Sequence, residues 1–324
     1  MRILFITSNR IGDAILSTGV LGALIERYPG CRITIACGPL AVPIFRHAPG
    51  VEHIHVMRKA PLIGHWRKLL AATMFRRWDL VVDIRGSATA YVLRAGERRV
   101  LRPDHSKHRV PHIASVLDLD PPPAPRVWPG EAARARAAAA IPEGRIVLAV
   151  GPTANWARKT WPAGRFAELV ARLTGEGGAL AGAHVLIAAA PDEREATAQV
   201  RAAVPADRLI DLVGEELDVV AAFLERSRFF VGNDSGLMHL AVAAGTPTLG
   251  LFGPTRDDLY GPWGPKAAFV RGPRSCAEII GDPDFDKESR ESAMLDLTVD
   301  NVLKAADALI ARTASPARER ETRV

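Results

Sequence analysis

The chain has 324 residues, of which 48% are hydrophobic and 24% are charged, and this average composition excludes disordered, collagen-like and coiled-coil proteins. With about 150 residues per domain as a guide, the length predicts two domains. Basic residues outnumber acidic ones by 42 to 36, a net charge of +6, which favours an anionic partner or surface.

The cysteines and the apolar runs predict the compartment. Three cysteines without a C-x-x-C pair are typical of a reducing environment. The apolar run at residues 3–6 is too short for a signal peptide, and no later window reaches about 18 apolar residues. We therefore expect a cytoplasmic protein without a membrane span.

Short apolar runs alternate with helical stretches along the chain. Residues 2–7 are expected to form a buried strand, and residues 13–27 the helix that follows it. Further strands are predicted at 32–37, 51–57, 80–84, 146–150, 184–190, 209–213, 229–232 and 248–252. This alternation predicts an α/β protein with doubly wound parallel sheets covered by helices on both faces.

A proline-rich run divides the two series of strands. The run Pro121-Pro122-Pro123-Ala124-Pro125 favours extended, semi-rigid backbone, and an Ala/Arg-rich helix is expected at 130–140. We therefore place two Rossmann-like domains at residues 1–142 and 143–313. The tail, 314–324, is expected to fray.

Asp13 follows the first predicted strand, where the next helix should begin. One interpretation is an N-cap, because an aspartate side chain can accept a hydrogen bond from a free backbone N–H at that position. The other is a site residue, because ligands of doubly wound sheets bind beyond the carboxyl ends of the strands. The sequence leaves both interpretations open.

A second strand-to-helix turn has the sequence Gly232-Asn233-Asp234-Ser235-Gly236-Leu237-Met238-His239. Asp234 or Ser235 can cap the helix, and Gly236 lets a diphosphate approach the free backbone N–H groups. His239 lies one turn after Ser235 on the same helical face. It is either an interior histidine or part of the same ligand site, and the neighbouring cap and glycine favour the second interpretation.

Another polar loop follows the predicted strand at 146–150. It contains Thr153, Lys159 and Thr160, whose hydroxyl and ammonium groups can donate hydrogen bonds to phosphate oxygens. Exposed basic residues in a loop are more often only solvated, so this loop is a candidate phosphate site rather than a demonstrated one.

Basic residues gather in the first half of the chain. Five of them, Arg67, Lys68, Arg98, Arg99 and Arg102, are candidates to bind an anionic acceptor, because guanidinium forks fit phosphate and carboxylate groups. The segment 65–78 mixes cations with Trp, Leu, Met and Phe. It predicts either a helix that lies on an anionic membrane or an ordinary amphipathic surface helix.

Several common site signatures are missing from the sequence. It contains no G-x-G-x-x-G, no Walker loop and no G-x-S-x-G, which disfavours common dinucleotide dehydrogenases, P-loop ATPases and esterases. Two Asp-x-Asp pairs, at 118–120 and 282–284, could hold a divalent ion. Both lie in loop-like segments and are interpreted as solvated acids, so no metal site is predicted.

Several of these segments together resemble glycosyltransferase family 9, the lipopolysaccharide heptosyltransferase family. The resemblance rests on Ile11-Gly12-Asp13, Arg158-Lys159-Thr160-Trp161-Pro162, residues 232–241 and 245–255, Gly261-Pro262-Trp263-Gly264 and residues 294–298. It spans about residues 2–310. One departure is Gly214-Glu215-Glu216-Leu217, which replaces a common Gly-x-Thr/Ser-x-Leu stretch near the nucleotide base.

The resemblance implies a GT-B fold, in which two Rossmann-like domains face each other across a cleft. It implies a metal-independent, inverting transfer without a cofactor, typically of heptose from ADP-heptose to an anionic lipopolysaccharide core. Asp13 would be the general base. Lys159, Asp234, Ser235, Gly236 and His239 would hold the donor.

Two other functions fit the same architecture. A nucleotide-sugar epimerase would rearrange or hydrolyse the donor without a lipid acceptor, and a noncatalytic protein would only bind the nucleotide sugar. The partners expected for the leading hypothesis are the donor, an anionic glycolipid and the inner face of the membrane, with no nucleic acid.

Overall fold

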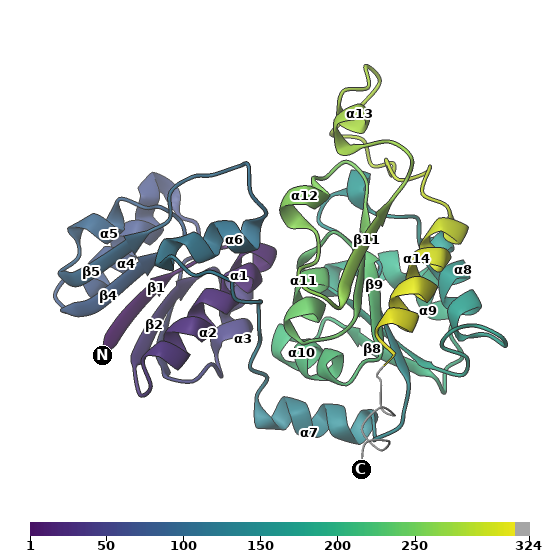
Figure 1. The fold of residues 1–324 in the computed structure, drawn as a ribbon, viewed down its shortest axis with the longest axis horizontal. Coiled ribbons are helices and arrows are strands. Elements are labelled where there is room, and N and C mark those ends of the chain that lie inside the picture. Colours follow the sequence, from purple (N-terminus) through teal and green to yellow (C-terminus); the bar gives the residue numbers. More distant parts are fainter. Residues whose placement is uncertain (315–324) are drawn as a thin grey trace, which may run out of the picture.

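The computed structural model describes residues 1–314, which form two α/β domains side by side (Figure 1). Apart from Ala314, the tail predicted to fray lies outside the described residues. The change from the first sheet to the second falls between residues 100 and 147.

Five parallel strands form the first sheet, in the order β3-β2-β1-β4-β5. They are β1 (Arg2–Ile6), β2 (Arg32–Cys37), β3 (Val51–Val56), β4 (Trp78–Asp83) and β5 (Ala95–Val100). The four residues from Ile3 to Ile6 are fully buried, because β1 lies in the middle of the sheet with helices on both faces.

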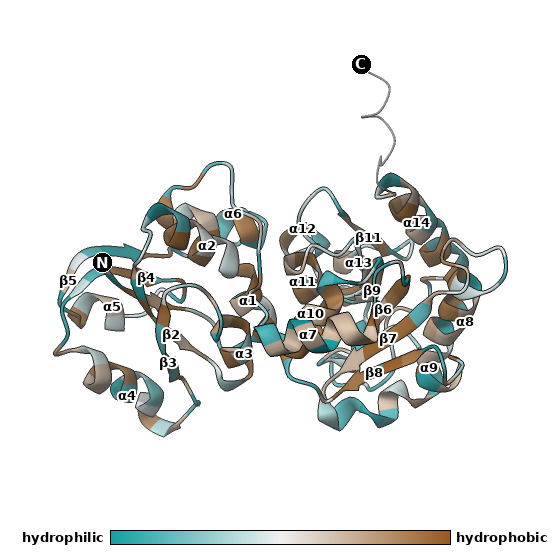
Figure 2. Cartoon of the chain, turned by 90° about the horizontal axis from the view of Figure 1, so that it is seen from below, coloured by the Kyte–Doolittle hydropathy of each residue, from teal (hydrophilic) through white to brown (hydrophobic). Residues whose placement is uncertain are grey.

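Six parallel strands form the second sheet, in the order β11-β10-β9-β6-β7-β8. They are β6 (Val147–Gly151), β7 (His184–Ala189), β8 (Leu209–Val213), β9 (Phe229–Asn233), β10 (Thr248–Phe252) and β11 (Ala267–Arg271). Strand β9 is buried along its whole length. In Figure 2 the strands β6 and β7 are coloured as strongly hydrophobic, whereas β5 of the first sheet is largely hydrophilic.

Helices cover both sheets. The first domain contains α1 (Ile11–Leu16), α2 (Thr18–Arg27), α3 (Val42–Phe45), α4 (Gly64–Thr73), α5 (Thr89–Val92) and α6 (Arg109–Ala114). The rest are α7 (Glu131–Ala140), α8 (Ala163–Thr174), α9 (Ala198–Ala202), α10 (Leu217–Glu225), α11 (Gly236–Ala243), α12 (Asp257–Tyr260), α13 (Cys276–Ile280) and α14 (Val299–Arg312). Within residues 1–314, no helix is long and apolar enough to cross a membrane.

The structure confirms the strands predicted from apolar runs and adds two edge strands, β5 and β11. The helix expected over 13–27 is interrupted at Ser17, between α1 and α2. The Ser17 hydroxyl donates to the carbonyl of Ala14, and its Oγ lies 2.7 Å from the Thr7 Oγ1 atom. A long-range side-chain contact therefore holds the interruption against the end of β1.

Both sheets reverse their strand order at an inner pair of strands. In the first sheet the reversal lies between β1 and β4, and in the second between β6 and β9. Ligands of open α/β sheets bind beyond the carboxyl ends of the strands at such a reversal. Asp13 follows β1, Lys159 follows β6 and Asp234 follows β9, so the fold places these candidate residues at the expected edges.

The linker helix α7 bridges the domains below the sheets in Figure 1 and packs on α10. Its Arg134 pairs with Glu225 through two hydrogen bonds of 3.0 Å, and its Arg136 pairs in the same two-pronged way with Glu215. The helix predicted at 130–140 is confirmed.

Candidate active site

Helices α1 and α11, one from each domain, meet at their N-terminal ends. A Cβ atom on Gly236 would lie 2.8 Å from the Ile11 Cγ2 atom, and one on Gly12 would lie 3.2 Å from the His239 Cδ2 atom. Glycine at both positions therefore permits the close approach. The approach brings Asp13 on α1 and His239 on α11 near the boundary between the domains.

Asp13 is not an N-cap. Helix α1 begins at Ile11 with Arg10 at the cap position, and Asp13 lies in the first turn, because the helix starts two residues earlier than the sequence suggested. Its carboxylate is 17% exposed, and Oδ1 accepts a hydrogen bond from the Arg109 Nε atom at 3.3 Å. Within residues 1–314, Asp13 Oδ2 accepts no hydrogen bond, so one carboxylate oxygen is available for proton transfer.

No side chain caps the N-terminus of α11. Ser235 occupies the cap position without accepting a hydrogen bond from the helix, and the cap predicted from Asp234 or Ser235 is therefore wrong. Among the described residues, four buried polar atoms in the segments that follow strands β6, β9 and β10 have no partner: Arg158 Nε, Ser235 Oγ, His239 Nδ1 and Thr255 Oγ1. Buried polar atoms are normally hydrogen-bonded, so this group is suited to contact a polar ligand.

His239 is uncharged near neutral pH. Burial lowers its pKa to about 4, although the charges of Asp234 and Asp13 act in the opposite direction. It can donate a hydrogen bond to a phosphate oxygen as a neutral imidazole, and it carries a positive charge only if a bound anion raises its pKa.

Lys159 and Asp234 form a largely buried ion pair. The Lys159 Nζ atom lies 3.4 Å from the Asp234 Oδ2 atom, and the two side chains are 14% and 10% exposed. Asn233 holds the loop that carries Lys159, because its amide accepts from the backbone N–H of Trp161 and donates to the carbonyl of Pro152. This lysine can thus be directed at the N-terminus of α11.

The two threonines of the same loop have other partners. The Thr153 hydroxyl donates to Glu193 at 2.7 Å, and the Thr160 hydroxyl donates to the carbonyl of Trp156 at 3.1 Å. Each hydroxyl oxygen keeps a free lone pair, but its proton is already used. A phosphate contact from either residue would require that proton to be redirected.

The five basic candidates fall into two groups. Arg67 and Lys68 lie exposed on α4, and within the described chain neither makes an ion pair. Arg98 and Arg99 lie on the edge strand β5, where Arg98 donates to the carbonyls of Ala90 and Leu93, and Arg99 pairs with Glu97 and Asp118.

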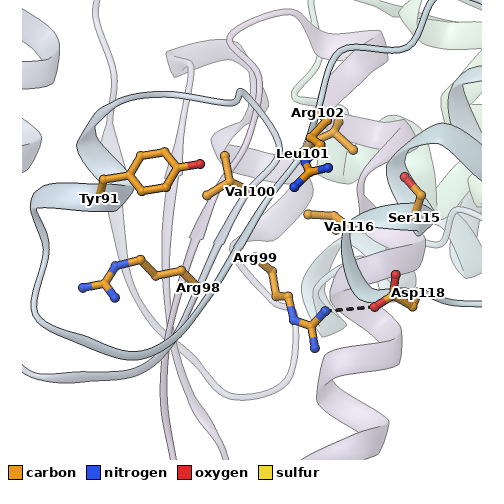
Figure 3. Close-up of a pocket in the computed structure, with 9 residues that line it drawn as sticks. All are labelled: Tyr91, Arg98, Arg99, Val100, Leu101, Arg102, Ser115, Val116 and Asp118. Atoms are coloured by element: carbon orange, nitrogen blue, oxygen red, sulfur yellow. Dashed lines mark hydrogen bonds and ion pairs between the residues drawn. The ribbon is translucent and has the colours of Figure 1, made fainter.

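Arg98, Arg99 and Arg102 line one cavity of about 520 Å³ (Figure 3). Its walls also include Tyr91, Val100, Ser115 and Asp118. Strand β5 forms the edge of the first sheet that is farthest from the second domain in Figure 1. The cavity is therefore apart from the contact between α1 and α11.

Residues 1–314 contain no group of three or more His, Cys, Asp or Glu side chains placed to hold a metal ion. Both Asp-x-Asp pairs contribute to local contacts instead. Asp118 pairs with Arg99, and Asp282 pairs with Arg274.

Three residues that were not predicted as site residues, His108, Arg109 and Tyr260, lie at the boundary between the domains. The His108 Nε2 atom lies 2.9 Å from the carbonyl of Gly261 in the second domain, and its ring lies against Trp263. Burial and the negative charge of Asp13 raise the pKa of Tyr260. Arg109 lies in the basic first half of the chain, but only the fold brings it to Asp13.

Glu215 and Glu216, which depart from the common Gly-x-Thr/Ser-x-Leu stretch, form ion pairs in the structure. Glu216 pairs with Arg46 of the first domain at 2.8 Å. Glu215 pairs with Arg136 of the linker helix. These hydrogen-bonded guanidinium groups lower the pKa of each carboxyl group. The two acids thus connect α10 to the first domain and to the linker helix.

Comparison with known proteins shows the family of the chain. The family described as glycosyltransferase family 9 (heptosyltransferase) matches residues 85–294. Lipopolysaccharide heptosyltransferase 2 of Escherichia coli K12 is 27% identical, over 96% of this chain and 99% of its own.

Solved structures have the same fold. The ADP-heptose lipopolysaccharide heptosyltransferase II of Escherichia coli has a TM-score of 0.73 at 23% identity and covers 97% of this chain and 100% of its own. The heptosyltransferase WaaC of Escherichia coli, solved with ADP, has a TM-score of 0.70 at 19% identity, over 95% and 100%. The two parallel sheets are those of a GT-B fold, and the chain belongs to glycosyltransferase family 9.

Proposed function

We propose that this glycosyltransferase moves heptose from ADP-heptose to an anionic lipopolysaccharide core acceptor, with inversion and without a metal ion. Relatives that align along nearly the whole chain are lipopolysaccharide heptosyltransferases, and this supports the substrate class. The observation that carries the proposal is the pair of buried atoms at the N-terminus of α11, Ser235 Oγ and His239 Nδ1, which have no partner within residues 1–314 and lie on the side of the domain boundary opposite Asp13. Family membership favours this activity over epimerisation and over binding alone.

The donor diphosphate would lie at the N-terminus of α11. The free backbone N–H groups at this end of the helix and the helix dipole attract anions. Lys159, 3.4 Å from Asp234, can turn to a phosphate oxygen and stabilise the charge that grows on the leaving group. Ser235 Oγ and His239 Nδ1, which have no partner within residues 1–314, would form hydrogen bonds with the phosphate or the sugar.

Asp13 would act as the general base. The acceptor hydroxyl gives its proton to Oδ2 while its oxygen forms a bond to the anomeric carbon. The bond from that carbon to the phosphate oxygen breaks, and its electron pair leaves with ADP. Attack occurs on the face opposite the diphosphate, so one displacement inverts the anomeric configuration.

The acceptor would bind on the first domain. Arg67 and Lys68 are exposed cations on α4, and Arg102 lines the cavity beside β5. Arg98 and Arg99 already bind groups of the first domain. They would therefore bind the acceptor while keeping these contacts.

The same part of the first domain would touch the membrane. Leu62 and Phe75, on either side of α4 in the chain, are 86% and 82% exposed, and α4 itself carries the cations Arg67 and Lys68. Trp78 does not contribute, because it is buried at the start of β4. Exposed apolar side chains flanked by cations suit the inner face of an anionic bilayer.

The test is incubation of the full chain with a lipid A–Kdo acceptor and either ADP-heptose or a UDP-sugar, followed by mass spectrometry. The proposal expects the acceptor to gain one heptose unit from ADP-heptose only. Free sugar without a modified acceptor would contradict it. A parallel reaction in excess EDTA should keep its rate, and a loss restored by Mg²⁺ or Mn²⁺ would overturn the metal-independent mechanism.

A further inference from the structure

The buried histidine His112 lies behind the Arg109–Asp13 pair. It is 4% exposed, and its Nδ1 atom lies 2.9 Å from the Arg109 Nη1 atom. On its other side, Nε2 lies 2.8 Å from the backbone carbonyl of Arg102. An unbroken series of hydrogen bonds thus runs from the Arg102 carbonyl through His112 and Arg109 to Asp13.

These partners determine the tautomer of His112. An arginine guanidinium only donates hydrogen bonds, so Nδ1 must accept and carry no proton. A carbonyl only accepts, so Nε2 must carry the proton. The arrangement therefore requires a neutral imidazole, because a proton on Nδ1 would face the N–H groups of Arg109.

Helix α6 makes the arrangement rigid. Arg109 and His112 lie three residues apart, on one face of α6, and Val110 and Ile113 anchor the helix in the core. The His108 side chain accepts from the Val110 N–H at the cap position and reaches Gly261 of the second domain. An arginine side chain loses rotamer entropy when it is immobilised, so a buried acceptor on a fixed helix is an effective way to hold it.

We infer that His112 is a positioning residue for the transfer reaction. Its neutral Nε2–H tautomer holds Arg109 against Asp13 Oδ1 and leaves Oδ2 directed to the acceptor hydroxyl. The inference rests on the proposed function, because it assigns His112 a role in orienting the base. His112 touches neither substrate, and it acts through Arg109.

Two variants of His112 separate positioning from packing. His112→Leu fills the space but removes both hydrogen bonds, so Arg109 can leave Asp13. His112→Gln keeps an acceptor for Arg109 and a donor for the Arg102 carbonyl. We expect His112→Leu to lower kcat about 10- to 100-fold with little change in the donor KM, as small misplacements of reacting groups do, and His112→Gln to restore most of it.

Thermal unfolding of both variants serves as the control for packing. Equal kcat values for His112→Leu and the unchanged protein, or a loss that His112→Gln fails to restore at similar thermal stability, would overturn the inference.

A spectroscopic measurement on the unchanged protein is independent of turnover and of variant folding. Nitrogen-15 NMR should show an unprotonated Nδ1 and a protonated Nε2 for His112 at neutral pH. A protonated Nδ1 would overturn the inference whatever sugar is transferred. Absence of heptosyl transfer by the unchanged protein, with the expected NMR tautomer, would instead contradict the proposed function.

Discussion

Arg109 and Asp13 are 96 residues apart in the chain, yet the Arg109 Nε atom lies 3.3 Å from Asp13 Oδ1. The contact exists because α6 lies beside α1 at the carboxyl edge of the first sheet. The same α1 packs against α11 of the second domain. The proposed base is therefore held by its own domain where it can face a donor bound by the other.

Replacement of Asp13 by Asn tests the base. The Asn side chain has nearly the same shape but cannot take the proton, so kcat should fall by about 10²- to 10⁴-fold with little change in thermal stability. Glu26→Gln, at an exposed acid on α2 that pairs with Arg126, is the matched control. Near-full turnover of Asp13→Asn would remove the assignment.

Replacement of Lys159 by Ala tests stabilisation of the leaving group. A cation that acts mainly on charge developing in the transition state affects kcat more than KM. Steady-state kinetics with the donor varied should therefore show a lower kcat and a modest rise in the donor KM. Lys304→Ala, at an exposed lysine on α14, should change neither, and a pure KM effect in Lys159→Ala would indicate ground-state binding only.

Neutralising Arg67 and Lys68 together tests the acceptor surface. Exposed charges are screened over about 8–10 Å at ordinary salt, so the acceptor KM of the unchanged enzyme should rise with ionic strength. Arg67→Gln with Lys68→Gln should raise it at low salt, while the donor KM stays nearly constant. The control pair, Lys266→Gln with Lys304→Gln, replaces exposed cations of the second domain. If the acceptor KM changes with neither salt nor substitution, this surface does not bind the acceptor.

His239 makes stability depend on pH. Its pKa falls from an ordinary 6.5 to about 4 in the folded chain, so below 6.5 the unfolded chain takes up a proton that the folded chain does not. The contribution of His239 to the free energy of unfolding is therefore complete above pH 6.5 and is lost as the pH falls toward 4. His239→Gln should remove about 2 kcal/mol of the stability difference between about pH 7 and about pH 5.

Urea unfolding at the two pH values measures this difference. Burial also lowers the pKa of His55, in the first domain, to about 4, so His55→Gln should remove a second, separate part of the pH dependence. An unchanged pH dependence in His239→Gln would mean that its imidazole is not held neutral.

Local sequence patterns predicted most of the framework. The apolar runs identified β1 and β9, and the alanine-rich stretch identified α7. Strand β5 was missed because Glu97, Arg98 and Arg99 make it polar, as an edge strand can be. Its sequence has no apolar run, and only the pairing with β4 establishes it.

The candidate site was predicted in part. Some of its residues lie in turns with a local sequence pattern, and others depend on how distant elements pack. Turns after β1, β6 and β9 could be recognised locally, and the fold places Asp13, Lys159 and Asp234 at those turns. The contacts of Arg109, His112 and His108 depend on how α6 lies against α1 and the second domain. No short-range pattern carries that information. Likewise, the interruption at Ser17 depends on its contact with Thr7.

The most direct test of the central claim is the anomeric configuration of the product. We expect ADP-heptose and the lipopolysaccharide core acceptor to give ADP and a heptosylated acceptor, whose new glycosidic bond has the configuration opposite to that of the donor. Proton NMR of the purified product reads this configuration at the anomeric carbon. Inversion agrees with one displacement assisted by Asp13, and a retained configuration would contradict it.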